Sequence, residues 1–484
     1  MKNFFLQLLI SSFFVSKIIA DPYNCAGIQT INPPTNISIP WYYPAKWDIS
    51  QPAPQYAASQ NCTWIMNVPK GMFAYLAVKA NTVQPSILKM TDSVGYITTI
   101  ESTSKEQFFV TDPSFRVDLQ SFAVGTFGMT VQWYTVNPTI PTTVQIHSKS
   151  TPLILFGGDF DNATVIQADT RVSFLVVPPT TLDFYDFLRL TQVYDGPSIA
   201  STHIGNLYQF MSSGNNFVST GNSITFFSLY PGFRTGSGVI FQDYDDVKQF
   251  KSYKSINCIS FVNNCQFTIN ARQGTAAAIR YSPTFYVKNI EMPNTNELSV
   301  YTDYVKQSHK LADYKSTNTK TNIPQKFNGK LTTFVLDQDE ATIQFSDNAI
   351  DAKWTSGFDG RRGFFSSPNY GLSTNDQNFS DKIFGVSTSD ITYTVDGSSI
   401  NGDAILNVTI VLGGKTVISD IYTSSRLVGG VVKARGDSIE VQYQTNGSIT
   451  SGSYVTFRFE KSTSTALNGV FISFIFSIWI SLFK

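Results

Sequence analysis

The chain has 484 residues, and its 35 Lys and Arg residues balance its 35 Asp and Glu residues, so the formal net charge is zero. This balance excludes the nonspecific electrostatic attraction that dominates binding to nucleic acids and anionic membranes. Charged residues make up only 14% of the chain and aromatic residues another 14%. This composition favours β-sheets and uncharged loops over helices, and we do not expect a disordered chain.

The N-terminus has the pattern of a targeting segment. Met1-Lys2-Asn3 provides a short basic start, and the apolar run Phe4 to Val15 leads to Ala20 and Asp21. We interpret residues 1–20 as a secretory signal peptide that is cleaved after about Ala20. A membrane-spanning helix is the alternative, but the apolar run is short and polar residues interrupt it.

The four cysteines of the chain fit a secreted protein. An even number indicates disulfides in that compartment, and the spacing pairs Cys25 with Cys62 and Cys258 with Cys265. A zinc site is disfavoured because there is no CxxC motif and the three histidines are isolated in the sequence. These histidines are His147, His203 and His309.

The first part of the chain combines a strand pattern with a set of specific motifs. Trp64, Met66 and Val68 alternate with polar residues, as in a half-buried strand, and a turn follows them. Residues 21–136 resemble the nematode CUB-like domain, and we assign the first domain to residues 21–140. The motifs are Cys25, Ile31-Asn32-Pro33-Pro34, Trp41, Trp47, Gln60-Asn61-Cys62-Thr63-Trp64, Val68 to Ala74, Thr91-Asp92-Ser93, Phe108-Phe109 and Phe127 to Trp133.

Weaker echoes of the broader CUB pattern follow along the chain. Tyr185 to Leu190 and Val193 to Ser198 resemble the family's strand and Tyr-Asp-Gly turn, which places a degenerate CUB-like domain at 141–248. Leu298 to Asp303 and Phe345-Ser346-Asp347 echo these elements in a degenerate domain at 249–360. The segment Asp303 to Lys315 in this unit is the best helix candidate of the chain, with a long loop as the alternative.

A fourth CUB-like domain is expected at 361–461. Gly363 to Tyr370 resembles the opening of such a unit. Near its end, two alternating runs at 439–443 and 455–459 predict strands, with the turn residues Thr445 to Ser448 between them. Dividing the mature length by about 110 residues also gives about four units. The resemblance implies an all-β fold of tandem CUB-like jelly-roll β-sandwich domains, each with two antiparallel sheets.

The C-terminal residues 462–484 have the features of a glycolipid (GPI) anchor signal. Small and polar residues lead into the apolar tail Val470 to Phe483, and the tail is removed when such an anchor is attached. Ser462 and Ser464 are the candidate attachment residues. The tail is shorter than the roughly 20 residues of a spanning helix. A short hydrophobic strand, or a tail that fails to anchor, is the alternative.

Six Asn-x-Ser/Thr sequons follow the signal peptide, and together they predict a glycoprotein. Each needs an exposed position if it is used. The acceptor residues are Asn36, Asn61, Asn162, Asn378, Asn407 and Asn446.

The resemblance raises the question of calcium, since some CUB domains bind this ion through one Glu and two Asp. In the second unit Asp186 fits one position, but Leu229 and Pro178 stand where the other two acids would be. Asp303 and Asp347 are available in the third unit. We expect these aspartates to cap strand turns instead, and we predict no metal and no cofactor.

Other patterns have a functional and a structural interpretation, and the structural one is favoured for each. Gly413 to Thr416 looks like the end of a phosphate loop, but Thr409 replaces the required Gly, which favours a hairpin turn. The aromatic cluster Trp41 to Pro44 with Trp47 could stack on sugars or anchor a protein partner, but it fits core and edge residues of the first sandwich. The acidic stretch Asp243 to Asp246 fits a solvated linker.

Catalytic motifs are missing from the sequence. No histidine accompanies a nucleophile motif such as GxSxG, and neither HExxH nor an Asp-Thr-Gly motif occurs. We therefore predict that the protein is not an enzyme. A secreted hydrolase that depends on one of the three histidines is the alternative.

CUB modules generally act in recognition, and the nematode CUB-like group is linked to the response to infection. The resemblance therefore implies an extracellular recognition glycoprotein of innate immunity that binds an unidentified extracellular protein or glycan. The lipid anchor would hold it on the outer side of the plasma membrane, in membrane rafts, with a secreted form as the alternative. A structural glycoprotein of the extracellular matrix or of a luminal coat is the rival function.

Overall fold

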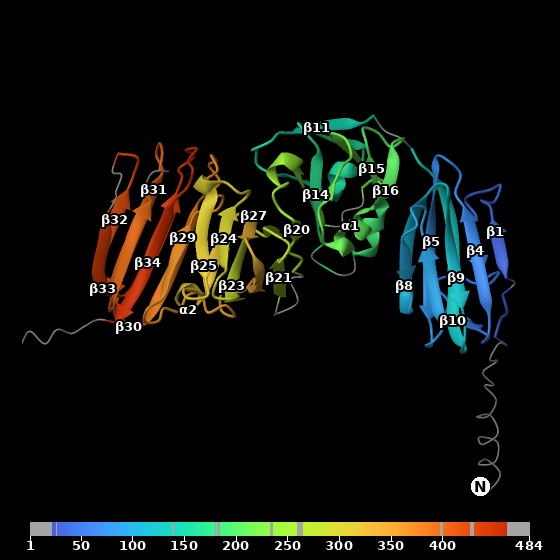
Figure 1. The fold of residues 1–484 in the computed structure, drawn as a ribbon, viewed down its shortest axis with the longest axis horizontal. Coiled ribbons are helices and arrows are strands. Elements are labelled where there is room, and N and C mark those ends of the chain that lie inside the picture. Colours follow the sequence, from blue (N-terminus) through green and yellow to red (C-terminus); the bar gives the residue numbers. More distant parts are fainter. Residues whose placement is uncertain are drawn as a thin grey trace, which may run out of the picture.

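The computed structural model describes residues 22–461, except residues 26, 138–139, 180, 182–183, 233–235, 259–264, 397–399 and 426–429 and the side chains of residues 104, 386 and 387. The expected signal peptide at 1–20 and anchor signal at 462–484, with Ser462 and Ser464, lie outside the described residues. Within them the chain is dominated by strands, as the composition predicts. Four β-sandwiches follow one another along the long axis of the molecule (Figure 1).

The first sandwich is built from two sheets, and β3 (Gln55–Tyr56) pairs with β10 at the side of the second. The first sheet has the order β1 (Ile28–Ile31), β4 (Asn61–Asn67), β9 (Ser114–Gln120), β6 (Ile87–Thr91) and β7 (Ile97–Thr99). The second has the order β2 (Trp41–Tyr43), β10 (Gly125–Thr135), β5 (Met72–Asn81) and β8 (Ser102–Thr111).

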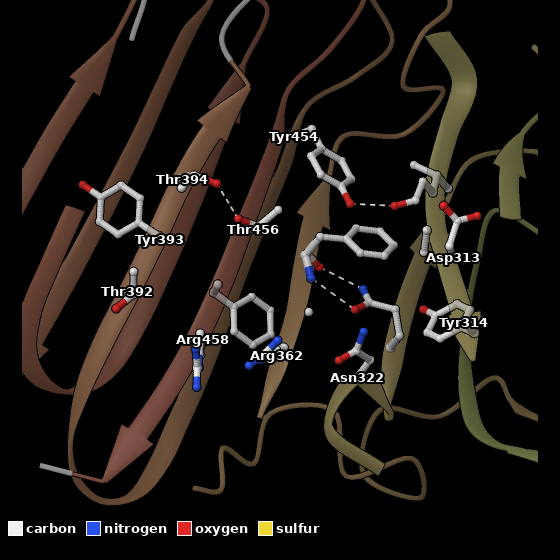
Figure 2. Close-up of a pocket in the computed structure, with 16 residues that line it drawn as sticks. Asp313, Tyr314, Asn322, Arg362, Thr392, Tyr393, Thr394, Tyr454, Thr456 and Arg458 are labelled. Atoms are coloured by element: carbon white, nitrogen blue, oxygen red, sulfur yellow. Dashed lines mark hydrogen bonds between the residues drawn. The ribbon is translucent and has the colours of Figure 1, made fainter. Parts of the chain in front are cut away.

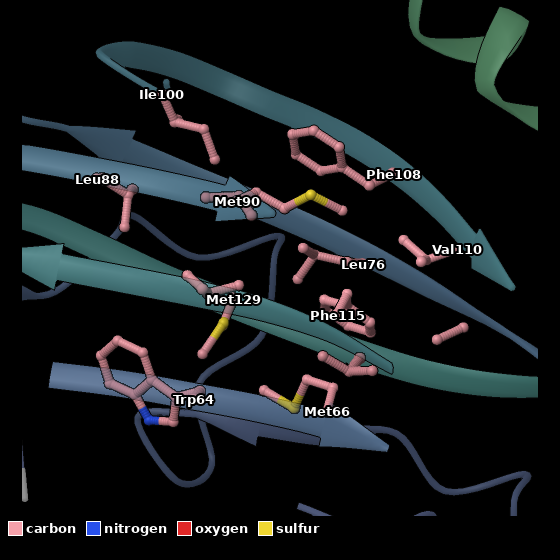
Figure 3. Packing of buried hydrophobic residues seen from close by; sticks show 14 of the residues in the cluster. Trp64, Met66, Leu76, Leu88, Met90, Ile100, Phe108, Val110, Phe115 and Met129 are labelled. Atoms are coloured by element: carbon pink, nitrogen blue, oxygen red, sulfur yellow. The ribbon is translucent and has the colours of Figure 1, made fainter. Parts of the chain in front are cut away.

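The core of this sandwich lies between its two sheets. Trp64 and Met66 are fully buried and alternate with partly exposed neighbours along β4, as the sequence pattern predicts. Figure 3 shows these side chains meeting Leu76, Phe115 and Met129 from the surrounding strands. Of the expected aromatic cluster, Tyr43 packs here, with 4.5 Å between its ring centroid and that of Trp64, and Trp41 packs against the same core. Trp47 is buried outside this core, against Gly128.

The second and third sandwiches repeat this arrangement. In the second sandwich, one sheet has the order β11 (Thr142–Ile146), β13 (Thr164–Ala168), β18 (Ser223–Ser228), β15 (Thr191–Asp195) and β16 (Thr202–Asn206). The other has the order β12 (Leu153–Phe156), β19 (Gly238–Asp243), β14 (Val172–Val177) and β17 (Phe217–Val218). In the third sandwich, one sheet has the order β20 (Ser252–Ser255), β22 (Ala276–Tyr281), β27 (Leu331–Leu336), β24 (Glu297–Thr302) and β25 (Lys310–Lys315). The other has the order β21 (Cys265–Ala271), β28 (Asp339–Ser346), β23 (Thr284–Glu291) and β26 (Gln325–Asn328). Two short helices, α1 (Leu207–Ser213) and α2 (Thr319–Asn322), also occur in these two units.

Strand for strand, the three sandwiches have the same topology once β3 is set aside. They differ from the expected antiparallel sheets in one respect. In each, the first strand of the five-stranded sheet is parallel to its neighbour: β1 to β4, β11 to β13 and β20 to β22. The reason is the path of the chain, which crosses through the opposite sheet between these two strands, and a parallel pair requires such a crossover.

The fourth sandwich departs further from the expectation of two separate sheets. It has one six-stranded sheet with the order β29 (Arg362–Ser366), β34 (Tyr454–Lys461), β30 (Phe379–Asp396), β33 (Val431–Gln444), β31 (Ile405–Leu412) and β32 (Lys415–Tyr422). The long strands β30 and β33 run through both layers and change register between Phe384 and Ser389. Such a bend lets one strand contribute to two packed layers. β30 thus corresponds to β4 and β5 of the first sandwich, and β33 to β8 and β9.

Two local expectations are also corrected. Residues 303–315 form no α-helix, because a 3-10 turn at Gln307–His309 leads into strand β25. The register of β24 and β25 shifts between Val300 and Tyr301. Because of this shift, Leu311 and Tyr314 are both buried although they are three positions apart, and this spacing is also typical of a helix. In the fourth sandwich, β33 and β34 are not partners, since β30 lies between them. The expected hairpin turn at Gly413 and Gly414 does connect β31 and β32.

The bend of the fourth sandwich yields a stability prediction at Gly436. A Cβ added there would clash with Ile410 and would lie 2.9 Å from the carbonyl oxygen of Val411. We therefore expect Gly436→Ala to lower the free energy of unfolding of this sandwich by about 1–3 kcal/mol, as overpacking usually does. Urea denaturation measures the change. Gly221→Ala is the matched control, because a Cβ at Gly221 meets no atom within 4 Å; equal stability of the two variants would contradict the prediction.

Candidate functional site

The cysteines and sequon residues are placed as follows. Cys25 is bonded to Cys62, with 6.1 Å between their Cα atoms, and Cys258 to Cys265, with 5.4 Å. Asn407 on β31 is partly buried. The other five sequon asparagines have exposed side chains: Asn36, Asn61, Asn162, Asn378 and Asn446.

The structure does not bring the three histidines together. His147 lies at the surface, with its Nδ1 3.0 Å from the carboxylate of Asp169. The Nε2 of His203 lies 2.8 Å from the Gln192 side-chain oxygen, and burial lowers the pKa of His203 to about 4. His309 is buried in the third sandwich. Over the described ranges no group of three or more His, Cys, Asp or Glu side chains is placed to hold a metal ion.

The aspartates considered as calcium ligands have other surroundings. The carboxylate of Asp186 is 2.7 Å from the Arg189 guanidinium, and that of Asp347 is 2.6 Å from the Arg280 guanidinium. Asp303 is buried between the second and third sandwiches, where burial raises its pKa to about 7. The expected solvated acidic linker is wrong for Asp243, which is 1% exposed and accepts hydrogen bonds from the backbone and hydroxyl of Thr170.

Buried contacts join the first sandwich to the second. Arg189 of the second sandwich is 3% exposed and forms an ion pair of 3.1 Å with Glu106 of the first. Its guanidinium carbon also lies 4.2 Å from the ring centroid of Phe108 and 4.0 Å from that of Tyr208. This arginine therefore holds the two units together by charge and by ring contacts.

An apolar cluster joins the second sandwich to the third. It contains Leu175 and Ile240 from the second unit, and Tyr253, Ile279 and Leu331 from the third. The Tyr253 hydroxyl donates a hydrogen bond of 2.5 Å to the Gln242 side chain across this cluster.

The third and fourth sandwiches meet edge to edge, and side chains replace backbone pairing there. The amide nitrogen of Gln325 on β26 donates to the Phe364 carbonyl on β29 at 2.8 Å, and its oxygen accepts from the Phe364 amide at 3.2 Å. The Asn328 side chain donates to the Ser366 carbonyl at 3.0 Å. These bonds cover the open edges of two sheets and fix the two units relative to each other.

Next to this edge, an open groove with a volume of about 360 Å³ separates the two units. Leu311 to Tyr314 of β25 form one wall, and the outer face of β29, β34 and β30 forms the other (Figure 2). The Tyr454 hydroxyl bridges the walls with a hydrogen bond of 2.6 Å to the Leu311 carbonyl. Thr394 and Thr456 point their hydroxyls toward each other at 2.5 Å (Figure 2).

Cationic side chains form a row across the second wall. In the strand register Arg362 is directly opposite Arg458, Arg458 is opposite Thr392, and Thr392 is opposite Lys433. Residues that are directly opposite on paired strands have their side chains on the same face. Arg362 and Arg458 line the groove, and Lys433 lies beyond it on the same sheet face. This row gives the second wall of the groove a cationic face.

Comparisons with known proteins bear on the first three sandwiches. The family described as CUB-like domain matches residues 20–137. The first sandwich is a match to the CUB-like family. Two families described as domains of unknown function, DUF7592 and DUF7591, match residues 145–229 and 245–348, which lie in the second and third sandwiches. No curated protein sequence matches the chain.

Solved structures with CUB domains are also similar in part. The CUB1-EGF-CUB2 domains of rat MASP-1 share 11% identity, with 43% of this chain and 99% of that chain covered and a TM-score of 0.18. The same region of human MASP-1/3 shares 11% identity, with 40% and 92% covered and a TM-score of 0.18. Tripeptidyl peptidase 2 shares 8% identity over 81% of this chain and 25% of its own, with a TM-score of 0.17.

The CUB-like match of the first sandwich and the two disulfides fit an extracellular interaction protein. In the part of the chain that the structure describes, no helix is long and apolar enough to cross a membrane. The groove was not predicted from the sequence, because its lining comes from five separate segments. The alternation of exposed Arg458 with buried Phe457 and Phe459 was its one local signal.

Proposed function

We propose that the protein is a non-enzymatic recognition glycoprotein of the cell surface, held by a GPI anchor, that binds extracellular molecules in innate defence against microbes. The observation that carries this proposal is the polar groove between the third and fourth sandwiches. Its two walls are fixed by buried hydrogen bonds of Gln325 and Asn328. A pre-formed, polar and open site of this kind suits recognition, because little conformational entropy is lost on binding.

Other features support an extracellular location. Both disulfides are of the kind that persists in oxidising compartments. Five of the six sequon asparagines are exposed, as glycosylation requires. The absence of catalysis is part of the proposal, and it rests on the missing catalytic motifs of the sequence. The histidines lie apart: His147 contacts Asp169 at the surface, His203 lies 2.8 Å from Gln192 and 3.4 Å from the Thr111 hydroxyl, and His309 is buried.

Enzymatic release from cells tests the anchoring. On cells that express the full-length chain, phosphatidylinositol-specific phospholipase C is expected to release the protein into the medium, because a GPI anchor is its substrate. Deletion of residues 470–484 removes the apolar tail and is expected to abolish surface retention. Protein that is free in the medium without the enzyme would contradict the anchor.

Binding to microbes tests the recognition role on the same cells. We expect bacteria to adhere to expressing cells, and adhesion to fall to the level of non-expressing cells after the phospholipase treatment. Protein deposited in an insoluble extracellular layer, without adhesion of bacteria, would favour the structural glycoprotein instead.

A further inference from the structure

The groove between the third and fourth sandwiches has an unusual distribution of charge. Arg362 and Arg458 are directly opposite each other on β29 and β34, and neighbouring strands are about 5 Å apart. Like charges in this position repel each other and destabilise the sheet. A negatively charged ligand between the two guanidinium groups would relieve this repulsion.

The cations of the row differ in their partners. Lys433 is 3.1 Å from Asp390, and Arg458 is 2.7 Å from Glu460, so both are neutralised by acids of the next row. The Arg362 side chain is exposed, and none of the ion pairs or side-chain hydrogen bonds among the described residues involves it. Its planar guanidinium is therefore available to bind a carboxylate or sulfate through two parallel hydrogen bonds.

The opposite wall does not cancel this charge. Asp313 is the one acidic residue that lines the groove within the described ranges. Its carboxylate already forms an ion pair of 2.7 Å with Lys310 and accepts a hydrogen bond of 2.6 Å from Ser299. The groove as a whole thus retains an excess of positive charge, and this excess is centred on Arg362.

The remaining lining indicates the kind of molecule that carries the anion. Thr392, Thr394 and Thr456 present hydroxyls on the same face as the arginines, and Asn322 adds an amide from the third sandwich (Figure 2). Hydroxyls, amides and a guanidinium match the hydroxyls and acidic groups of a sugar chain. No exposed Trp or Phe lines the groove, so its exposed polar groups carry the recognition.

We propose that this groove binds an acidic polysaccharide, whose carboxylate or sulfate pairs with Arg362 while the threonine hydroxyls and Asn322 bind its sugar hydroxyls. This inference rests on the proposed extracellular function and names the ligand class of its site. The row of cations runs across the strands, so the sugar chain lies along the row, from Arg362 toward Arg458.

Surface plasmon resonance with the full-length protein, purified from expressing cells, tests the proposal. The immobilised probes are heparin, which is sulfated, hyaluronate, which carries only carboxylates, and neutral dextran. We expect binding to at least one acidic polymer and none to dextran. Arg362→Gln is expected to weaken binding about tenfold or more, since it removes a charge-assisted pair, and Arg362→Lys to restore part of it. Binding to heparin alone would show that the groove requires sulfate. Binding to both polymers would show that a carboxylate is sufficient for binding.

Arg272→Gln is the control, because Arg272 is an exposed arginine of the third sandwich that pairs with Glu340 and does not line the groove. We expect its binding to equal that of the original protein. Lack of binding to both acidic polymers, or equal binding by Arg362→Gln, would overturn the proposal. Phospholipase release of Arg362→Gln from cells is expected to be unchanged, so a failure of the ligand assignment is distinguishable from a failure of the proposed function.

Discussion

Replacement of Arg189 by methionine is expected to lower the stability of the junction between the first and second sandwiches by about 3 kcal/mol. The guanidinium of Arg189 is paired at 3.1 Å with Glu106 and at 2.7 Å with Asp186, and it donates to the Gln107 carbonyl at 2.7 Å. Methionine fills much of the same volume but leaves the Glu106 carboxylate without its counter-ion. Removing one partner of a buried pair costs more than the pair itself contributes, because the remaining charge stays desolvated.

Urea denaturation and limited proteolysis near residues 136–141 measure this effect. The chain has several units, so the transition of the first sandwich is followed separately from the others. Arg116→Met is the matched control, since Arg116 is 53% exposed and its pair with Asp118 contributes little. Adding Glu106→Gln to Arg189→Met is expected to recover part of the loss. Equal stability of the Arg189→Met and Arg116→Met variants would show that the buried pair does not hold the junction.

Replacement of Asp303 by asparagine is expected to raise the stability of the protein above neutral pH. Asp303 is 4% exposed, and its Oδ2 has no hydrogen-bond partner. Burial raises its pKa from 3.8 to about 7, although a hydrogen bond from Thr151 acts in the opposite direction. Asparagine has the same shape without the charge and tolerates the left-handed backbone that Asp303 adopts, with φ of 64°.

The sign of the pH dependence follows from the direction of this shift. Between about pH 4 and pH 7 the folded state holds a proton on Asp303 that the unfolded state has lost. The contribution of Asp303 to the free energy of unfolding therefore falls as the pH rises through this window and is constant above it. At pH 8 the ionised carboxylate costs up to about 4 kcal/mol, from about three pKa units at 1.4 kcal/mol each. We expect Asp303→Asn to recover a large part of this cost at pH 8 and to change stability little at pH 4.

Denaturation curves at both pH values test this expectation. Burial lowers the pKa of His203 and His309, so these histidines destabilise the fold at acid pH. The difference between variant and original protein at each pH therefore isolates Asp303. Asp303 and the exposed Asp376 line one cavity between the second, third and fourth units. Asp376→Asn is the control and is expected to have little effect at either pH. A fall in stability at pH 8 for Asp303→Asn would contradict the prediction.

The local features of the fold could be predicted from the sequence because short patterns determine them. The alternation of Trp64, Met66 and Val68 indicates both a strand and its buried face. The hairpin at Gly413 depends on two glycines with positive φ, a requirement that is visible in the sequence. The spacing of the cysteines similarly predicts the two pairs that the structure contains.

Features that depend on distant partners could not be predicted in this way. Alternation shows which face of β33 is buried, but not that β30 rather than β34 is its neighbour. A bulge in β25 made Leu311 and Tyr314 look helical. The charge of Asp243 suggested that its side chain is exposed to solvent, whereas the fold places Thr170 beside it and the Thr170 backbone amide donates a hydrogen bond to its carboxylate. The groove depends on the opposition of Arg362 and Arg458, which are almost a hundred residues apart and become neighbours only through sheet register.

The edge contact of the third and fourth sandwiches has a consequence for biosynthesis. Phe364 and Tyr370 precede most strands of the fourth unit, yet both are buried in the aromatic core of the third. As the chain grows, the third unit therefore lacks part of its interior until these residues have been synthesised. At roughly 5–20 residues per second this interval lasts only a few seconds. During it, the β26 edge lacks its contacts with β29 and presents unpaired backbone groups, which is the state of an edge strand that favours pairing with another chain.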